Sequence, residues 1–120
     1  MSDNQVKTKS FLFAIRIVKL YQYLVSEKKE FVLSKQLLRS GTSIGANVRE
    51  AQNAESKADF IHKLSVSQKE TDEVLYWLEL LKETNYLTES EFLSIQTDAI
   101  QLLKMLRSII ITTRKKVNNS

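Results

Sequence analysis

Hydrophobic residues recur every three or four positions over most of this chain, which is the spacing of amphipathic helices. Short polar stretches interrupt the pattern three times. The sequence therefore predicts four helices, over about residues 8–26, 32–53, 57–84 and 89–114. Helices joined by such short connections favour an antiparallel up-down bundle, usually left-handed. We expect an all-α fold in which residues 1–120 form a single four-helix-bundle domain.

Capping signals support two of the predicted helix starts. Ser56 precedes the third helix, and Asp59 takes the place of the usual capping-box glutamate. Thr88 and Glu91 form a full capping-box pattern before the fourth helix. The last segment, RKKVNNS, is polar and terminal, so we expect it to fray.

The first and fourth helices carry more hydrophobic surface than one core contact requires. The first helix has one stripe of Phe11, Ala14, Ile15, Val18, Tyr21 and Val25, and a second set of Phe13, Ile17, Leu20 and Leu24. The fourth helix has a seam of Phe92, Ile95, Ala99, Leu102, Leu106, Ile109 and Thr113, and a second face with Leu93, Ile100, Leu103, Ile110 and Ile111. Such surplus is typical of an interface between chains, so we expect a homo-oligomer.

The stretch RSGTSIGANVREA contains both glycines of the chain, Gly41 and Gly45. A phosphate-binding loop would need four residues between its glycines, a following lysine and a preceding strand, and this stretch has none of them. The apolar spacing instead places it inside the second helix, where each glycine costs about 0.5–1 kcal/mol relative to alanine. We expect a neighbouring helix to approach closely at both glycines, with polar side chains bonding across the contact.

Polar residues interrupt the apolar seams of the second and third helices at the same level. If the turn lies near residues 54–57, antiparallel partners have numbers that sum to about 111. The residues that then face each other are Ser40 and Thr71, Ser43 and Gln68, and Ile44 and Ser67. The polar stripe continues at Asn47 and Glu50. Buried polar groups of this kind must form hydrogen bonds with each other, because each group left without a partner destabilises the fold by roughly 1–3 kcal/mol. The layer either fixes helix register only, or gives Asn47 or Glu50 a binding role.

The composition of the chain limits the cellular compartment and the kinds of metal site that we expect. The chain has no cysteine, so it can form neither a disulfide nor a thiolate metal site. No apolar run approaches the ~18–20 residues of a membrane span. The start, MSDNQVKTKS, lacks the apolar core of a signal peptide. We therefore expect a cytoplasmic protein without a membrane partner.

Residues that could carry catalysis form no marked pattern. A di-metal site in a four-helix bundle needs glutamates from two helices and Glu-x-x-His from two others, whereas this chain has one histidine, His62. No Ser, His and Asp arrangement is distinguished by spacing. The acidic residues between Glu70 and Glu83 are typical of a solvated helix face. We expect no enzymatic activity, no metal and no cofactor.

Charge is unevenly distributed, although the formal net charge is only +4. Residues 1–49 carry +6, residues 50–100 carry −7 and residues 101–120 carry +5. Summed positive charge on helix surfaces is the footprint of phosphate binding. The candidate contacts are Lys7, Lys9, Arg16, Lys19, Arg107, Arg114, Lys115 and Lys116. A purely structural or protein-interaction module with no nucleic-acid role is the alternative.

The segment LLRSGTSIGANVREAQNAESKADFIHKL, followed by KETDEVLYWLELL, resembles the four-helix-bundle family encoded by intervening sequences of bacterial 23S rRNA genes. The likeness covers about residues 6–113. The family's common form is Ser-Ile-Pro-Ala-Asn-Ile-Ala-Glu-Gly, and this chain matches it at Ser43, Asn47 and Glu50; Glu73 also matches in the third helix. The proline and the final glycine of the motif are replaced, as in a variant branch.

The resemblance implies a closed up-down bundle, and relatives look like ring-shaped homopentamers. A related branch is the accessory protein of diversity-generating retroelements, a basic pentamer that binds nucleic acid and a reverse transcriptase. By this resemblance we expect self-association as a pentamer, with RNA or DNA, and a reverse transcriptase or another protein, as partners. The expected function is that of a non-enzymatic, low-specificity nucleic-acid-associated accessory or scaffolding protein.

Overall fold

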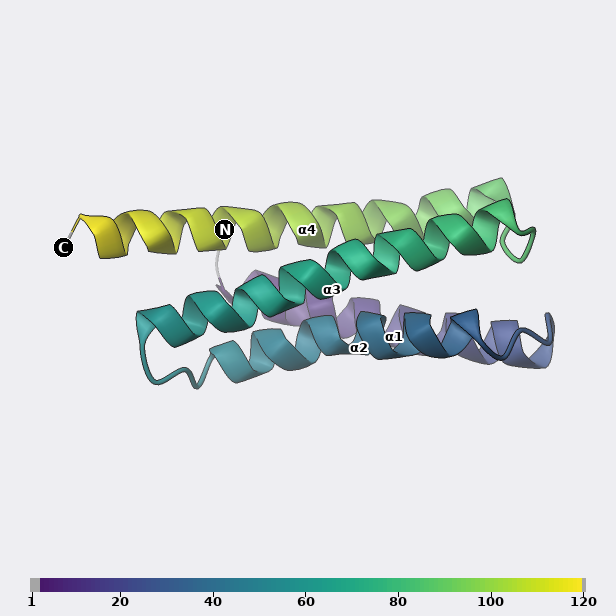
Figure 1. Cartoon of the computed structure of the whole chain (residues 1–120), viewed down its shortest axis with the longest axis horizontal. Helices are drawn as coiled ribbons and strands as arrows, with labels where there is room; N and C mark the ends of the chain where they lie inside the picture. The colour runs from purple at the N-terminus through teal and green to yellow at the C-terminus, as the bar shows by residue number, and fades with distance from the viewer. Residues whose placement is uncertain (1–2, 120) are drawn as a thin grey trace.

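The computed structural model describes residues 3–119 and shows four helices over that range, without any strand. The helices are α1 (Asp3–Ser26), α2 (Leu33–Ala51), α3 (Lys57–Glu83) and α4 (Glu89–Asn118). They run alternately up and down in a body of 52 × 22 × 19 Å (Figure 1). The predicted all-α four-helix bundle is confirmed.

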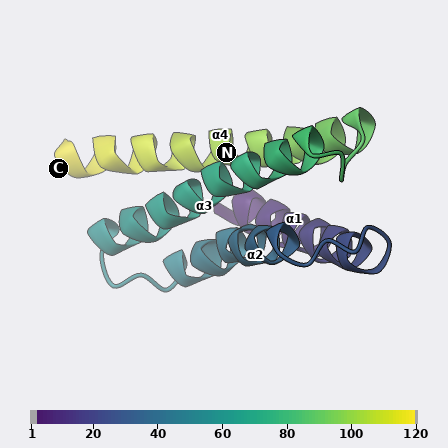
Figure 2. The same cartoon turned by 45° about the vertical axis from the view of Figure 1, so that its right-hand side comes forward.

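Two helix ends lie further out than the sequence predicted. α1 begins at Asp3 rather than near residue 8, because its additional first turn packs the buried side chain of Val6 into the core. α4 continues to Asn118, so the expected fraying of the final segment is wrong over its described part. Lys115 and Lys116 favour the helix, because cations near its C-terminus interact well with the helix dipole. As a result, α4 projects past the ends of the other helices (Figure 1 and Figure 2).

The starts of α3 and α4 carry the predicted caps. The Ser56 hydroxyl accepts the backbone N–H of Asp59 at 3.0 Å. At α4, the Thr88 hydroxyl accepts the N–H of Glu91, and the Glu91 carboxylate accepts the N–H of Thr88, which completes the capping box. The start of α2 is capped by the carboxylate of Glu30, which the sequence analysis did not identify.

Only one of the two hydrophobic stripes of α1 faces the core. The buried side of this helix consists of Val6, Ser10, Phe13, Ile17 and Leu24. The other stripe is exposed at Phe11, Ile15 and Val18. The first helix therefore presents a hydrophobic face to solvent, as the surplus of apolar residues suggested.

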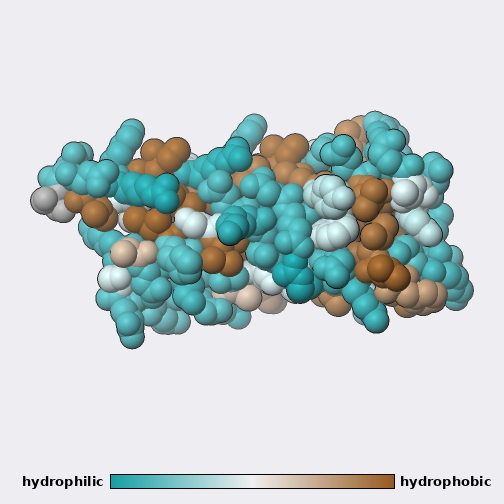
Figure 3. Space-filling view, in the orientation of Figure 1, coloured by the Kyte–Doolittle hydropathy of each residue, from teal (hydrophilic) through white to brown (hydrophobic). Residues whose placement is uncertain are grey.

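The hydrophobic surplus of α4 is smaller than predicted. Its seam is buried as expected, at Phe92, Ile95, Ala99, Leu102, Leu106 and Ile109. Of the second face, Leu103 and Ile110 are also buried, because α4 packs against both α1 and α3. Leu93 and Ile111 remain about half exposed. Figure 3 shows hydrophobic side chains reaching the surface along α4 in patches between hydrophilic ones.

Gly41 and Gly45 lie where α2 crosses closely against α1. A Cβ added to Gly41 would lie 2.7 Å from both Cγ atoms of Ile17. A Cβ on Gly45 would lie 3.2 Å from the carbonyl oxygen of Ser10. The predicted close approach is confirmed. The expected polar bonding across it is wrong, because the buried polar layer lies on the side of α2 that faces α3.

That polar layer is built from three buried hydroxyls, on Ser40, Ser67 and Thr71. Ser67 donates to the carbonyl oxygen of Ile44 across the α2–α3 contact at 2.9 Å, which confirms the predicted pairing of these two residues. Ser40 and Thr71 instead donate to carbonyls four residues earlier in their own helices. The side chains therefore do not bond one another, because a hydroxyl inside a helix reaches its own backbone first.

Candidate nucleic-acid interface

One end of the bundle is strongly basic. At this end α1 begins, α2 ends, α3 begins and α4 ends (Figure 1). Residues 3–10, 46–69 and 103–119, which we call the basic end, carry eleven Lys/Arg and four Asp/Glu, or a net +7. The rest of the chain carries a net −3. The molecule is therefore electrically polarised along its long axis.

The projecting part of α4 contributes most of this charge. Asp98 is the last acidic residue of the sequence, and five cations follow it: Lys104, Arg107, Arg114, Lys115 and Lys116. All five are exposed. Within residues 3–119, none of these five forms an ion pair. Exposed cations without anionic partners are available to phosphate groups.

The predicted cations of α1 divide into two groups. Lys7 and Lys9 lie at the basic end, exposed and without an ion pair among the described residues. Lys19 is also exposed, but it lies in the second half of α1, outside the basic end. Arg16 is engaged, because its guanidinium bonds the carboxylate of Asp98 at 2.7 Å and Ser94 of α4 as well. Arg16 therefore links α1 to α4, and of the eight predicted phosphate contacts it is the one that has an anionic partner among the described residues.

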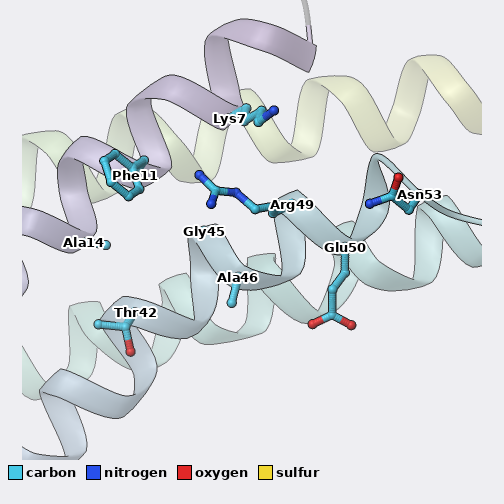
Figure 4. A pocket seen from close by; sticks show the side chains of 9 residues that line it. All are labelled: Lys7, Phe11, Ala14, Thr42, Gly45, Ala46, Arg49, Glu50 and Asn53. Carbon is cyan, nitrogen blue, oxygen red and sulfur yellow. The ribbon is translucent and has the colours of Figure 1, made fainter.

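A hollow between α1 and α2 brings together residues that the sequence analysis had treated separately. We call it the Phe11 hollow; it is open to solvent, has a volume of about 440 Å³ and is lined by Lys7, Phe11, Ala14, Thr42, Gly45, Ala46, Arg49, Glu50 and Asn53. Figure 4 shows Lys7 and Phe11 of α1 facing Arg49 of α2. The Arg49 guanidinium carbon lies 5.5 Å from the centroid of the Phe11 ring. No ion pair holds Arg49 within the described residues.

Sequence reasoning missed Arg49 as a member of the basic surface. The sequence did contain a clue to its position. Arg49 follows Gly45 by four residues and so lies one turn further along the same face of α2. The bare backbone at Gly45 lets the two helices approach, and this approach places Arg49 over the ring of Phe11.

The predicted polar-layer residues lie at the edge of the α2–α3 contact rather than in the core. Ser43, Asn47, Gln68 and Glu73 are half-buried, and Glu50 is exposed. Their prediction as a buried layer is wrong, because the buried face of α2 runs through Ser40, Ile44 and Val48, which leaves the motif residues one step round the helix.

Most of these edge residues form hydrogen bonds with nearby groups of α2 and α3. Ser43 donates to the carbonyl oxygen of Arg39, and the Asn47 amide donates to the carbonyl oxygen of Ser43. Glu50 accepts from Lys63 at 3.0 Å, and this bond raises the pKa of Lys63. Figure 4 shows the Glu50 carboxylate pointing away from Lys7 and Phe11.

Glu73 belongs to a separate cluster with Arg39, Glu70 and Trp77. Arg39 bonds both carboxylates, and the Trp77 indole donates to Glu73 at 3.1 Å. Burial raises the pKa of Glu73, but the hydrogen bonds from Arg39 and Trp77 outweigh it and leave the pKa below its usual value. Glu50 and Glu73 therefore have different partners, and they do not form one polar pocket with Asn47.

The described residues contain no group of three or more His, Cys, Asp or Glu side chains placed to hold a metal ion. Among the helices of residues 3–119, none combines the length and hydrophobicity of a membrane span. The chemistry that the basic end offers is therefore cationic and aromatic contact.

Comparison with known proteins covers nearly the whole bundle. The family model described as 23S rRNA-intervening sequence protein matches residues 2–108. A 1.70 Å crystal structure of a protein with unknown function from Bacteroides thetaiotaomicron, assigned to the S23 ribosomal protein family, superposes with a TM-score of 0.90. That protein is 59% identical, over 92% of this chain and 98% of its own. Comparison with curated proteins gave no match.

Proposed function

The chain belongs to the 23S rRNA-intervening sequence protein family, and from this premise we propose that it is a non-enzymatic, homo-oligomeric bundle that binds RNA or DNA through the phosphate backbone. The proposal places it in the cytoplasm, as an accessory or scaffolding protein with low sequence specificity. A reverse transcriptase or another protein would be a further partner.

The observation that carries the proposal is the set of unpaired cations at the basic end. Arg114, Lys115 and Lys116 are exposed near the end of α4, the part of this helix that projects past the other helices. Lys7, Lys9 and Arg49 add charge from α1 and α2. Phosphate binding depends on summed charge, so this arrangement favours affinity without base recognition.

Self-association is supported by the exposed hydrophobic face of α1. Leu12 and Ile15 are exposed and line an open groove of about 380 Å³ between α1 and α4. We place the contact between subunits on this side of α1, next to the Phe11 hollow, which lies on the α2 side. A closed ring such as a pentamer would repeat the basic end around one axis and multiply its charge.

Salt dependence of binding tests the proposal. We expect the chain to bind mixed-sequence single-stranded and duplex RNA at low salt, with a steep loss of affinity as salt is added. The variant Arg114→Glu, Lys115→Glu, Lys116→Glu should lower the slope of log affinity against log salt by about one for each phosphate that the protein no longer neutralises.

The matched control reverses three exposed cations at the opposite end, Lys28→Glu, Lys29→Glu and Lys35→Glu, and so changes the net charge equally. It should retain most of the binding. Equal losses in both variants would show a general charge effect rather than a site. If the unaltered protein binds neither the single-stranded nor the duplex probe at low salt, the proposal is overturned. The alternative, a protein-interaction module, then remains.

A further inference from the structure

The Phe11 hollow has features that general phosphate binding does not require. Phe11 is 52% exposed although it is a large aromatic residue, and it lies beside two cations rather than in the core. The small residues Ala14, Gly45 and Ala46 also line the hollow. An exposed aromatic ring lined by small residues suits a planar group better than it suits a phosphate alone.

The cations at this site come from two different helices. Lys7 lies one turn before Phe11 on α1, and Arg49 reaches across from α2 (Figure 4). Neither forms an ion pair within residues 3–119. The carboxylate at the rim, on Glu50, is engaged by Lys63 and so leaves the two cations free for an anion.

The size of the hollow also fits a nucleotide. Its volume of about 440 Å³ falls within the ~300–1,000 Å³ range of small-molecule sites. Base stacking on an exposed aromatic ring tolerates any sequence, because every base has a π-face. The guanidinium of Arg49 lies over one face of the Phe11 ring, so a base stacks on the opposite face or takes the place of the guanidinium, and either way a cation stays next to the base.

We propose that the Phe11 hollow binds one unpaired nucleotide, whose base stacks on Phe11 and whose phosphate lies between Lys7 and Arg49. This inference rests on the proposed function and adds to it a preference for single-stranded RNA or DNA. A duplex keeps its bases stacked on one another and can offer this site only its backbone. Asn53, at the rim, supplies an amide for the edge of the base.

The chain offers a matched control for the aromatic contact. Phe31 is also 52% exposed and lies in the connection between α1 and α2, at the opposite end of the bundle. The variants Phe11→Leu and Phe31→Leu therefore remove the same ring from equally exposed positions. Circular dichroism checks that both fold, and light scattering checks that both keep the mass of the unaltered protein.

The experiment measures fluorescence anisotropy with a labelled 12-nucleotide oligouridylate and with a 12-base-pair RNA duplex. We expect Phe11→Leu to weaken binding of the single strand about fivefold or more, from the loss of one stacked base, and to leave duplex binding unchanged. Phe31→Leu should change neither. A single strand containing 2-aminopurine should change its fluorescence on binding the unaltered protein but not Phe11→Leu.

Several results would overturn the inference. Equal effects of Phe11→Leu and Phe31→Leu, or equal loss of single-strand and duplex binding, would remove the stacking site while leaving backbone binding intact. A change of mass confined to Phe11→Leu would assign the ring to a subunit contact instead. Absence of binding by the unaltered protein to both probes would refute the proposed function, and this inference with it.

Discussion

At the scale of single residues, Glu30 shows how one side chain starts a helix. Its carboxylate accepts the backbone N–H groups of Val32, Leu33 and Ser34 at 3.2, 3.0 and 2.6 Å. Burial raises the pKa of Glu30, but the three backbone N–H groups lower it further, so the pKa lies below its usual value of 4.5. The folded state thus favours the charged carboxylate.

The stability supplied by Glu30 should depend on pH. A lowered pKa means that the contribution is complete above about pH 4.5 and is lost as the pH falls through the folded-state pKa. We expect Glu30→Gln to destabilise the fold by about 1–2 kcal/mol at pH 7, the usual size of a lost helix cap. Urea denaturation at pH 7 and pH 3 measures this. The difference between the two proteins should be smaller at pH 3 than at pH 7; a difference that stays constant with pH would contradict the role of the charge.

Gly41 is a residue whose absent side chain matters. Alanine there would gain about 0.5–1 kcal/mol of helix propensity. It would also press against Ile17, which is fully buried and branched at the atoms that are too close. Overpacking of this kind costs about 1–3 kcal/mol, so we expect Gly41→Ala to destabilise the fold by about 1–2 kcal/mol.

A double-mutant cycle on urea denaturation tests this contact. Ile17→Ala removes both crowded atoms, so Gly41→Ala should be harmless in that background. Ile17→Val keeps both atoms and should give no relief. Stabilisation of the unaltered background by Gly41→Ala would show that the helices separate easily here.

At the scale of helices, the two buried hydroxyls of α3 have different roles. Ser67 bonds across to α2, whereas Thr71 bonds only within its own helix. We expect Ser67→Ala to cost about 1 kcal/mol, the usual net value of one hydrogen bond. Thr71→Val keeps the shape and should stay within about 0.5 kcal/mol of the unaltered protein. Thermal melts of both variants at one protein concentration measure the difference, and a larger loss for Thr71→Val would reverse these assignments.

The elements themselves were largely predictable from the sequence. The apolar period and the caps at Ser56 and Thr88 placed the starts of α3 and α4 correctly, because both signals are local. The first turn of α1 was missed, because its support comes from the tertiary burial of Val6. The core stripe of α1 could not be chosen from two equally apolar stripes, because the choice depends on where Gly41 and Gly45 admit the neighbouring helix.

The candidate site was only partly predictable, for a similar reason. The cations that follow Asp98 were evident, since their clustering is a property of the sequence. The capture of Arg16 by Asp98 spans 82 residues and has no local signal. The meeting of Phe11 with Arg49 likewise depends on the crossing of α1 and α2.

At the scale of the whole molecule, the basic end and the exposed hydrophobic face of α1 lie next to each other. The basic end carries +7 and the rest of the chain −3, while the exposed face of α1 carries Leu12 and Ile15 beside the groove to α4. The proposed nucleic-acid binding and the proposed self-association therefore use neighbouring surfaces, and Lys9 lines the same groove as Leu12 and Ile15. A substitution that disrupts one should leave the other measurable.

We expect the paired substitution Leu12→Asp, Ile15→Asp to lower the mass in light scattering towards the 13.9 kDa of one chain, because buried carboxylates at a subunit contact are costly. The control is Leu93→Asp, Ile111→Asp on α4; these residues are 48% and 53% exposed, against 55% and 38% for Leu12 and Ile15. The control should keep the oligomer. A loss of mass in the control alone would move the contact to the outer face of α4, and a mass of one chain for the unaltered protein would refute self-association.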